Sequence, residues 1–450
     1  MRTFDLIVIG GGTGGLHVAR TAKKAGWNVA IVDELPYGGT CALRGCDPKK
    51  MLVGATDALD WVRRMKGKGL NGDGVGVNWE DLMAFKRTFT EAMPPRIESG
   101  LERAGIEVLH GSALFVAKDR IEIDGRGFTA KNFHIATGAT PRPLGIPGAE
   151  LVSSSTDFLE LAQLPKRIVF IGGGFISFEF AHIAARSGAT VTIVHKHPLP
   201  LAQFDPDLVR MQVERTRALG ITLHLDFCVD AVEAKDGALE VVCSGPGPER
   251  RVTCDLVVHG AGRVAKLEGL GLDVAGVEHG PRGIRVSKSL RSISNRAVFA
   301  AGDCADTSVP NLTPVSFYEA RIAAKNLLAG EDAQETDYPP IPSAVFTIPP
   351  IARVGLLEDD AREAGFDFEV NFKETGEWYS SMRVAEKYSA FKVLVEKQTK
   401  KVLGAHFMGP GAEEQVNLLT MAMKADLTAN QIKSVMFAYP SYASDIGSMV

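Results

Sequence analysis

The hydrophobic and polar positions of the chain follow the same order in two separate stretches. In the first, an apolar run at 4–9 leads into closely spaced glycines, a helical pattern at 16–25 and a β-branched run at 29–32. In the second, a helical pattern at 178–187 separates an apolar run and its glycines from a β-branched run at 191–194. Each stretch of about thirty residues predicts a βαβ unit. Two such units predict an α/β fold with two Rossmann-like dinucleotide-binding domains.

Proline and glycine clusters divide the rest of the chain. A Pro/Gly-rich stretch at 141–147 separates the two units, and an acidic, Pro-rich stretch at 330–342 is typical of a linker. Between them, residues 298–303 are typical of a buried strand that runs into a turn, and a helical pattern follows at 313–328. The last part of the chain has strand patterns at 352–356, 391–395 and 402–408 and helical patterns at 413–424 and 428–435. We therefore expect a third, α+β domain at the C-terminus.

The composition removes several functional classes. The formal net charge of the 450 residues is −4, which gives no electrostatic reason for binding nucleic acid or a membrane surface. No stretch approaches the ~18 apolar residues of a membrane span. The six cysteines are too scattered for a secreted disulfide scaffold, so we expect a cytoplasmic enzyme.

The first glycine cluster has the spacing of a dinucleotide-binding turn. Gly10 permits a tight turn, Gly12 lets a pyrophosphate approach the backbone, and Gly15 permits close packing of helix on strand. Asp33, 18 residues after Gly15, is the acid expected to hold ribose hydroxyls. A generic glycine turn is the alternative, but strand, helix and acid together favour a nucleotide site.

The second cluster, Gly172, Gly174 and Ser177, is followed by His195 and Lys196 where the acid is expected. A carboxylate there would repel the 2′-phosphate of NADPH, whereas Lys196 would attract it. We therefore predict that this domain binds NADPH in preference to NADH. The alternative is that Lys196 is a solvated surface charge.

A cysteine pair follows the first βαβ unit. Cys41 and Cys46 are five positions apart, a spacing that suits a redox disulfide at the first turn of a helix. The dipole at that place would lower the pKa of a thiol. Two unlinked buried thiols are the alternative. A metal site would need further ligands, and no nearby Cys or His supplies them.

The segment at 38–50, GGTCALRGCDPKK, resembles the redox-active disulfide of the class I pyridine nucleotide–disulfide oxidoreductases. That family includes glutathione reductase, dihydrolipoamide dehydrogenase and mercuric reductase. The order of the other motifs is also similar, with Ala136-Thr137-Gly138 between the two glycine clusters and Ala301-Gly302-Asp303 after the second. The resemblance covers essentially the whole chain.

By this resemblance, Cys41 attacks the substrate and Cys46 lies against the flavin of FAD. Lys49 and Glu179 would lie near the flavin N5 atom. The resemblance assigns these residues to the FAD site: Gly10, Gly12, Gly15, Asp33, Gly39, Thr40, Thr137, Gly138, Asp303 and Thr313. It assigns these to the NADPH site, with NADH as the other coenzyme: Gly172, Gly174, Phe175, Ser177, His195 and Lys196.

The resemblance also gives each part of the chain a role. It implies a first part of an FAD-binding domain at 1–147, an NAD(P)H-binding domain at 148–265, a second, central part of the FAD domain at 266–335, and an interface domain at 336–450. In the family, the interface domain of one subunit covers the cysteine pair of the other. We therefore expect a homodimer.

One position departs from the family pattern. Most disulfide reductases of the family carry a His-Pro pair and a Glu near the C-terminus, and this dyad shuttles protons. Here Tyr439 replaces the His and Ser444 replaces the Glu. A phenol with an ordinary pKa near ~10 is a poor base at neutral pH, although it can donate a proton.

The sequence therefore predicts an FAD-dependent NAD(P)H oxidoreductase that passes electrons through Cys41 and Cys46 to a small disulfide, as in glutathione reductase, with Tyr439 as the proton donor. The alternatives are a reductase of metal ions, quinones or other non-disulfide acceptors, or a redox-sensing flavoprotein with little turnover. No cysteine follows Cys304, so the C-terminal cysteine pair of mercuric reductase has no counterpart.

Overall fold

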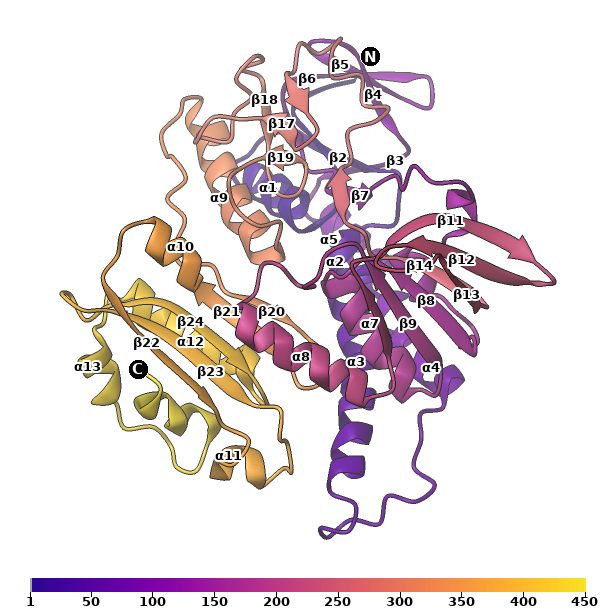
Figure 1. Cartoon of the computed structure of the whole chain (residues 1–450). Helices are drawn as coiled ribbons and strands as arrows, with labels where there is room; N and C mark the ends of the chain where they lie inside the picture. The colour runs from indigo at the N-terminus through magenta and orange to yellow at the C-terminus, as the bar shows by residue number, and fades with distance from the viewer. Residues whose placement is uncertain (1) are drawn as a thin grey trace. The chain divides into compact units, whose positions relative to one another are not determined.

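The computed structural model describes residues 2–450 (Figure 1). Its contacts divide the chain into two compact units. The first consists of the residues up to Lys49, Ala84–Arg142 and Gly262–Asp337, and the second of Lys50–Met83, Pro143–Ala261 and Tyr338–Val450. The four-part division expected from the sequence stays a prediction.

The first unit is built on a mixed sheet with the strand order β3-β2-β1-β6-β5-β4, and β18 pairs with β6. Its strands are β1 (Arg2–Ile9), β2 (Val29–Asp33), β3 (Glu107–His110), β4 (Ala113–Ala117), β5 (Arg120–Ile123), β6 (Arg126–Ile135) and β18 (Val298–Ala300). Side chains alternate along β1, so Leu6 and Val8 face α1 (Thr13–Lys24) and α9 (Thr313–Ala329), while Ile7 and Ile9 enter the core on the other face. The carboxyl ends of β1, β2 and β18 meet at one edge, where open α/β sheets bind ligands.

Smaller elements complete the first unit. They are α2 (Gly39–Arg44), α5 (Met93–Arg103), the pair β7 (Ala139–Pro141) and β15 (Arg263–Ala265), and a small sheet of β16 (His279–Gly280), β17 (Gly283–Arg285) and β19 (Ala305–Asp306). Two helices, α3 (Cys46–Arg64) and α4 (Trp79–Thr90), begin in one unit and end in the other.

The second unit contains a parallel sheet with the order β10-β9-β8-β14. These strands are β8 (Arg167–Ile171), β9 (Thr190–His195), β10 (Thr222–Leu225) and β14 (Leu256–His259), and an antiparallel sheet of β11 (Cys228–Lys235), β12 (Ala238–Ser244) and β13 (Arg250–Cys254) accompanies them. The helices of this part are α6 (Ser155–Phe158), α7 (Phe175–Arg186) and α8 (Pro206–Ala218). Phe178 and Phe180 of α7 share a core with Leu52 of α3.

The C-terminal part of the second unit is an antiparallel sheet with the order β20-β21-β24-β23-β22. Its elements are β20 (Ser343–Val345), β21 (Ile351–Gly355), α10 (Glu358–Glu363), β22 (Phe368–Glu374), α11 (Tyr379–Met382), β23 (Ala390–Glu396), β24 (Val402–Met408), α12 (Ala412–Lys424) and α13 (Ala429–Lys433). Val393 and Phe407 of the sheet form one core with Val416 of α12 and Ile432 of α13. In Figure 1 this part runs from orange to yellow.

The expected α/β class and the C-terminal α+β domain are confirmed. The predicted strand at 402–408 is β24, and the stretch at 330–342 lies between α9 and β20 without helix or strand. One local expectation is wrong. Cys41 and Cys46 do not share one helix, because Gly45 has φ −152° and ψ −110° and ends α2 before α3 begins. Among residues 2–450, no helix is long and apolar enough to cross a membrane.

Candidate functional site

The glycine turn after β1 brings backbone segments unusually close together. Gly10 has φ +114°, and a Cβ atom added there would lie 2.2 Å from the carbonyl oxygen of Ala136. A Cβ atom at Gly15 would lie 1.9 Å from the oxygen of Gly10. Helix α1 then begins with Gly12 as its N-cap, without a side-chain hydrogen bond to its first amides. These amides can therefore receive a phosphate group.

Asp33 occupies the place expected for the acid. At the end of β2, its Oδ2 accepts a hydrogen bond of 2.6 Å from the backbone N–H of Gly11, and Oδ1 accepts one of 2.8 Å from Leu35. These contacts fix the carboxylate beside the turn, where it can also accept hydrogen bonds from ribose hydroxyls.

Asp303 lies in the turn after β18, which is also at the carboxyl edge of the sheet. Burial raises the pKa of this carboxyl, and the nearby guanidinium of Arg263 opposes the rise. Gly302, with φ +75°, donates a 2.7 Å hydrogen bond to Glu319 and shapes the turn. A largely buried carboxylate needs hydrogen-bond donors, and the hydroxyls of a ribityl chain would supply them.

The residues of this edge fit FAD. The pyrophosphate would be held by the turn from Gly10 to Gly15, and the half-buried guanidinium groups of Arg44 and Arg263 supply positive charge in this unit. Asp33 and Asp303 supply acceptors for hydroxyl groups. Thr137 donates a hydrogen bond of 2.7 Å to the carbonyl of Lys266, and Gly138 has φ +70° with open space where its side chain would be, so both shape the chain beside the turn.

The cysteine pair lies next to the same glycine turn. Gly39 has φ +69°, and a Cβ atom added there would lie 2.5 Å from Cα of Gly12. Two residues later, Cys41 is half-buried in α2, while Cys46 starts α3 with its sulfur 3.7 Å from Oγ1 of Thr313. Thr40, between Gly39 and Cys41, is exposed. The fold thus brings the two predicted thiols, Thr313 and the glycine turn after β1 together within one unit.

The pKa of Cys41 differs from the sequence-based expectation. The hydrogen bond with the Cys46 thiol raises it, burial raises it further, and a hydrogen bond from Thr313 opposes the rise. The expected lowering of a thiol pKa by a helix dipole is therefore wrong for Cys41, because the hydrogen bond with Cys46 and burial both raise its pKa. Two sulfur atoms that share a hydrogen bond are close enough to interact directly during thiol–disulfide exchange.

The second glycine turn repeats the first, with a different side chain in the place of the acid. The backbone N–H of Gly173 donates a hydrogen bond of 3.0 Å to Nδ1 of His195, as Gly11 does to Asp33, and the partners are 22 residues apart in both cases. Burial lowers the pKa of His195, so the ring is neutral at pH 7. The position therefore carries no negative charge that would repel a phosphate group.

The other predicted coenzyme residues lie around this turn. Gly172 has φ +104°, and Gly174 is the N-cap of α7, again without a side-chain cap. Ser177 is buried against Gly260, where an added Cβ atom would lie 2.0 Å from the serine oxygen, so it serves the packing role of the third glycine. Phe175 is 49% exposed at the start of α7, and Lys196 is exposed directly after β9.

Glu179 is held from two sides within the second unit. Its Oε2 lies 2.9 Å from Nζ of Lys50, and its Oε1 accepts a 2.9 Å hydrogen bond from the backbone N–H of Phe346. The Lys50 ammonium also lies 3.8 Å from the centre of the Phe346 ring. Lys49 is buried and is the last residue of the first segment of the first unit. The pairing of Lys49 with Glu179 stays a prediction.

Helix α7 is joined to the segment between β20 and β21 by side chains on one of its faces. Besides Glu179, His182 accepts a 3.2 Å hydrogen bond from the backbone N–H of Ile348, and Arg186 donates one of 2.9 Å to the carbonyl of Ile348. Each of these side chains pairs with a backbone group. Helix α7 is therefore aligned against the C-terminal part of the chain.

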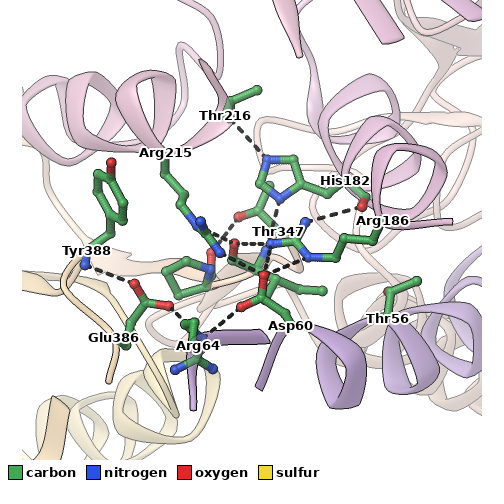
Figure 2. A network of polar contacts seen from close by, with 12 residues as sticks. Thr56, Asp60, Arg64, His182, Arg186, Arg215, Thr216, Thr347, Glu386 and Tyr388 are labelled. Carbon is green, nitrogen blue, oxygen red and sulfur yellow. Dashed lines mark hydrogen bonds and ion pairs between the residues drawn. The ribbon is translucent and has the colours of Figure 1, made fainter. Parts of the chain in front are cut away.

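A buried charge cluster lies at the end of α7 (Figure 2). Asp60 of α3 receives three guanidinium groups, from Arg186 at 2.8 Å, Arg215 at 2.7 Å and Arg64 at 2.8 Å. Burial alone would raise the pKa of Asp60. The three guanidinium groups lower this pKa by more than burial raises it, so the net shift is downward. Arg64 also lies 3.5 Å from Glu386. The cluster joins α3, α7, α8 and the C-terminal part of the second unit.

Tyr439, in the place of the family's histidine, is 83% exposed in the segment after α13. Met436, three positions earlier, is 98% exposed. Asp445, which follows the position of the missing Glu, accepts a hydrogen bond of 2.5 Å from Ser380 and is thus engaged locally. The role of Tyr439 as a proton donor stays a prediction.

Three groups of functional interest were missed in the sequence. Lys50 looks like the second half of a lysine pair, and Arg263 follows a loop without any motif. Asp60 has a helical pattern of charges around it that is typical of a solvated face. Of the three, only Arg263 could have been anticipated. The predicted acid Asp303 gave the signal, because a buried carboxylate usually requires a nearby cation or several hydrogen-bond donors.

Comparisons with known proteins agree with this arrangement. Residues 4–320 match the family described as pyridine nucleotide-disulphide oxidoreductase, and residues 341–450 match its dimerisation domain. A glutathione reductase of Burkholderia cepacia is 33% identical over 448 residues, which cover 98% of this chain and 97% of that protein. A mercuric reductase of Bacillus cereus is 29% identical over 98% of this chain and 70% of its own length.

Solved structures show the same similarity. The Cu(II) complex of the HOCl-induced flavoprotein disulfide reductase RclA from Escherichia coli has a TM-score of 0.89 and 26% sequence identity, over 100% of this chain and 99% of that chain. FAD and a nicotinamide coenzyme are the cofactors that the family and the two glycine turns have in common. The chain belongs to the pyridine nucleotide–disulphide oxidoreductase family and is an FAD-dependent NAD(P)H disulfide oxidoreductase.

Proposed function

We propose that this enzyme uses NADPH in preference to NADH and reduces a small disulfide through Cys41 and Cys46, as a glutathione reductase does. The observation that carries the acceptor chemistry is the contact between the two thiols beside Thr313. The observation that carries the coenzyme preference is the neutral His195 ring in the place of an acid, followed by the exposed Lys196.

The proposed reaction is balanced as NADPH, H⁺ and one disulfide giving NADP⁺ and two thiols. The Cys41 thiolate attacks the substrate disulfide and releases the first thiol. Cys46 then attacks the Cys41 sulfur, which releases the second thiol and forms the Cys41–Cys46 disulfide. Bound FAD supplies the two-electron connection between the nicotinamide and that disulfide. Protonation of the leaving thiolates falls to Tyr439, since the family's histidine is absent.

A thiol count tests the role of the pair. Anaerobic treatment with NADPH should add two titratable thiols to the oxidised protein, and Cys46→Ser should abolish both this gain and disulfide turnover. Cys228→Ser is the matched control, because Cys228 is an exposed thiol on β11 outside the site. An unchanged Cys46→Ser enzyme would contradict the proposal.

Steady-state kinetics test the coenzyme preference. Because a charge-assisted hydrogen bond to the 2′-phosphate is worth ~1.5–3 kcal/mol, the preference for NADPH should be at least about 10-fold in kcat/KM. Lys196→Glu should reverse it. Lys166→Glu, an exposed lysine at the opposite end of β8 from the glycine turn, should leave it unchanged. Equal use of both coenzymes by the parent enzyme would refute the preference.

Reduction of Cu(II) or another metal ion is the second candidate acceptor reaction. It is favoured by Tyr439, because a metal-ion acceptor needs no histidine base, and by the similarity to RclA, whose solved structure holds Cu(II). A screen of NADPH oxidation with glutathione disulfide, Cu(II), Hg(II) and quinones decides between the candidates. Quinones and Hg(II) extend the screen to the other acceptors of the family, and no turnover with any of them would favour a redox-sensing role.

We also propose that the enzyme is a homodimer that contributes Tyr439 to the partner's cysteine pair. The match of residues 341–450 to a dimerisation domain and the exposure of the segment around Tyr439 support this. Light scattering during gel filtration should give twice the 48.3 kDa of one chain. The four-part domain division and a cytoplasmic location stay predictions.

A further inference from the structure

The segment that carries Lys196 is anchored at several points. This coenzyme loop, defined as residues 196–205, connects β9 to α8. The carbonyl of His197 accepts a 3.2 Å hydrogen bond from Asp226, and the N–H of Leu201 donates one of 2.9 Å to the carbonyl of Gly173. Gly173 therefore binds Leu201 through its oxygen and His195 through its nitrogen. The hydrogen bond from Leu201 therefore attaches the loop to the glycine turn.

The far end of the loop is held by a buried lysine of the C-terminal sheet. Nζ of Lys392 on β23, a residue that is 2% exposed, lies 2.9 Å from Oδ2 of Asp205, 2.5 Å from Asp207 and 3.1 Å from Glu358. The contact with Asp205 is an ion pair, since Oδ2 has no well-aligned hydrogen bond. The other oxygen of Asp205 caps α8 by accepting hydrogen bonds of 3.0 and 3.3 Å from Asp207 and Leu208.

A second cation of the same sheet contacts the loop. Arg353 of β21 donates hydrogen bonds to the carbonyl of Gln203 in the loop and, at 2.5 Å, to the carbonyl of Gly355 in its own strand. Two neighbouring positions of the loop, Gln203 and Asp205, are thus fixed by side chains of the C-terminal sheet. One contact fixes a backbone oxygen and the other fixes a carboxylate.

We propose that Lys392, assisted by Arg353, is a positioning residue for recognition of the 2′-phosphate of NADPH. This inference rests on the proposed coenzyme preference. Removing the ammonium leaves the buried carboxylate of Asp205 without its cation. The end of the loop then shifts toward solvent. Because the loop is only ten residues long, the shift reaches Lys196, while the hydrogen bond from Leu201 to Gly173 keeps the glycine turn in place.

The test compares coenzymes that differ in the 2′-phosphate alone. Dissociation constants of NADP⁺ and NAD⁺ are measured by calorimetry for the FAD-loaded parent, Lys392→Met, Lys392→Arg and Lys397→Met. Lys397→Met is the matched control, because Lys397 directly follows β23 and forms a surface ion pair with Asp367 at 2.6 Å. Lys392→Met should weaken NADP⁺ binding ~10-fold, as expected when about one charge-assisted hydrogen bond is lost.

The same variant should change NAD⁺ binding by less than about twofold, because NAD⁺ has no 2′-phosphate to lose. Lys392→Arg should restore most of the NADP⁺ affinity, and Lys397→Met should match the parent. Equal weakening of both coenzymes would show a purely structural role and would overturn the inference. If Lys392→Met does not fold, Arg353→Gln removes the contact with Gln203 and should give the same selective loss.

The failure of this inference is distinguishable from that of the proposed function. A parent enzyme that binds both coenzymes equally would refute the coenzyme preference, and this inference with it. A parent that prefers NADP⁺, combined with an unchanged ratio in both Lys392→Met and Arg353→Gln, would overturn the inference alone.

Discussion

Replacing Asp60 by asparagine should destabilise the second unit strongly. The side chain of Asp60 is 4% exposed, and the change leaves Arg186 and Arg215 without this carboxylate and Arg64 with Glu386 alone. Burial lowers the pKa of Arg186 to about 10 although Asp60 opposes this, so the guanidinium is charged at neutral pH in the parent protein. Breaking a buried ion pair by removing one partner costs roughly 3–5 kcal/mol.

The loss should appear as a lower temperature of unfolding. For cooperative units of 150–250 residues, each kcal/mol corresponds to roughly 2–4 °C, so we expect a decrease of at least about 6 °C for the FAD-loaded enzyme, followed by circular dichroism. Asp57→Asn is the control, because Asp57 is exposed on the same helix one turn earlier, and it should shift the midpoint by less than about 2 °C. A decrease of less than about 2 °C for Asp60→Asn would refute the reasoning.

The cluster also has a predicted pH dependence. The pKa of Asp60 is lowered from its ordinary value of 3.8 in the folded protein. Its contribution to stability is therefore complete above pH 3.8 and is lost as the pH falls through the lowered folded value. The difference in unfolding temperature between the parent and Asp60→Asn should narrow as the pH falls below 3.8. A difference that stays constant to lower pH would contradict the assigned charge state.

Three further changes have defined outcomes. Glu179→Gln removes the ionic partner of Lys50. Because one charge-assisted hydrogen bond is lost, flavin reduction by NADPH should slow about 10- to 100-fold in stopped-flow absorbance. An unchanged rate would exclude a role for this carboxylate. Gly39→Ala would place a Cβ atom 2.5 Å from Gly12 at φ +69°, so the purified protein should contain much less FAD, and full FAD content would contradict the close approach. Tyr439→His should raise turnover of glutathione disulfide at least ~10-fold if proton transfer limits it, and an unchanged kcat/KM would show that the missing histidine is not limiting.

Much of the fold could be predicted because its causes are local. The glycines at 10, 12 and 15 are required by contacts within a few residues of themselves and with the next strand, and this requirement leaves a fixed spacing in the sequence. The same holds for the alternating apolar positions of β1. In both cases the sequence pattern predicts the structure, because the contacts that require these residue types lie within one short segment.

The charge clusters could not be predicted, since their partners are distant in the chain. Asp60 lies 126 residues from Arg186 and 155 residues from Arg215, and each of these side chains alone is typical of a solvated helix surface. Lys392 was not singled out in the sequence either, although its neighbours in β23 up to Val395 are apolar. The predicted lowering of the Cys41 pKa was wrong because the hydrogen bond with the Cys46 thiol and burial both raise it.

The attachment of α7 to residues 346–348 has a consequence for how this region can vary. Glu179, His182 and Arg186 bind the peptide groups of Phe346 and Ile348, not their side chains. Most exchanges of amino acid at those two positions therefore leave these hydrogen bonds available. Proline is the exception, since it has no N–H to donate. An inserted residue would displace the peptide groups of this segment from the side chains of α7 that bind them. Homologous enzymes are free to drift in composition along this stretch while its length stays constant.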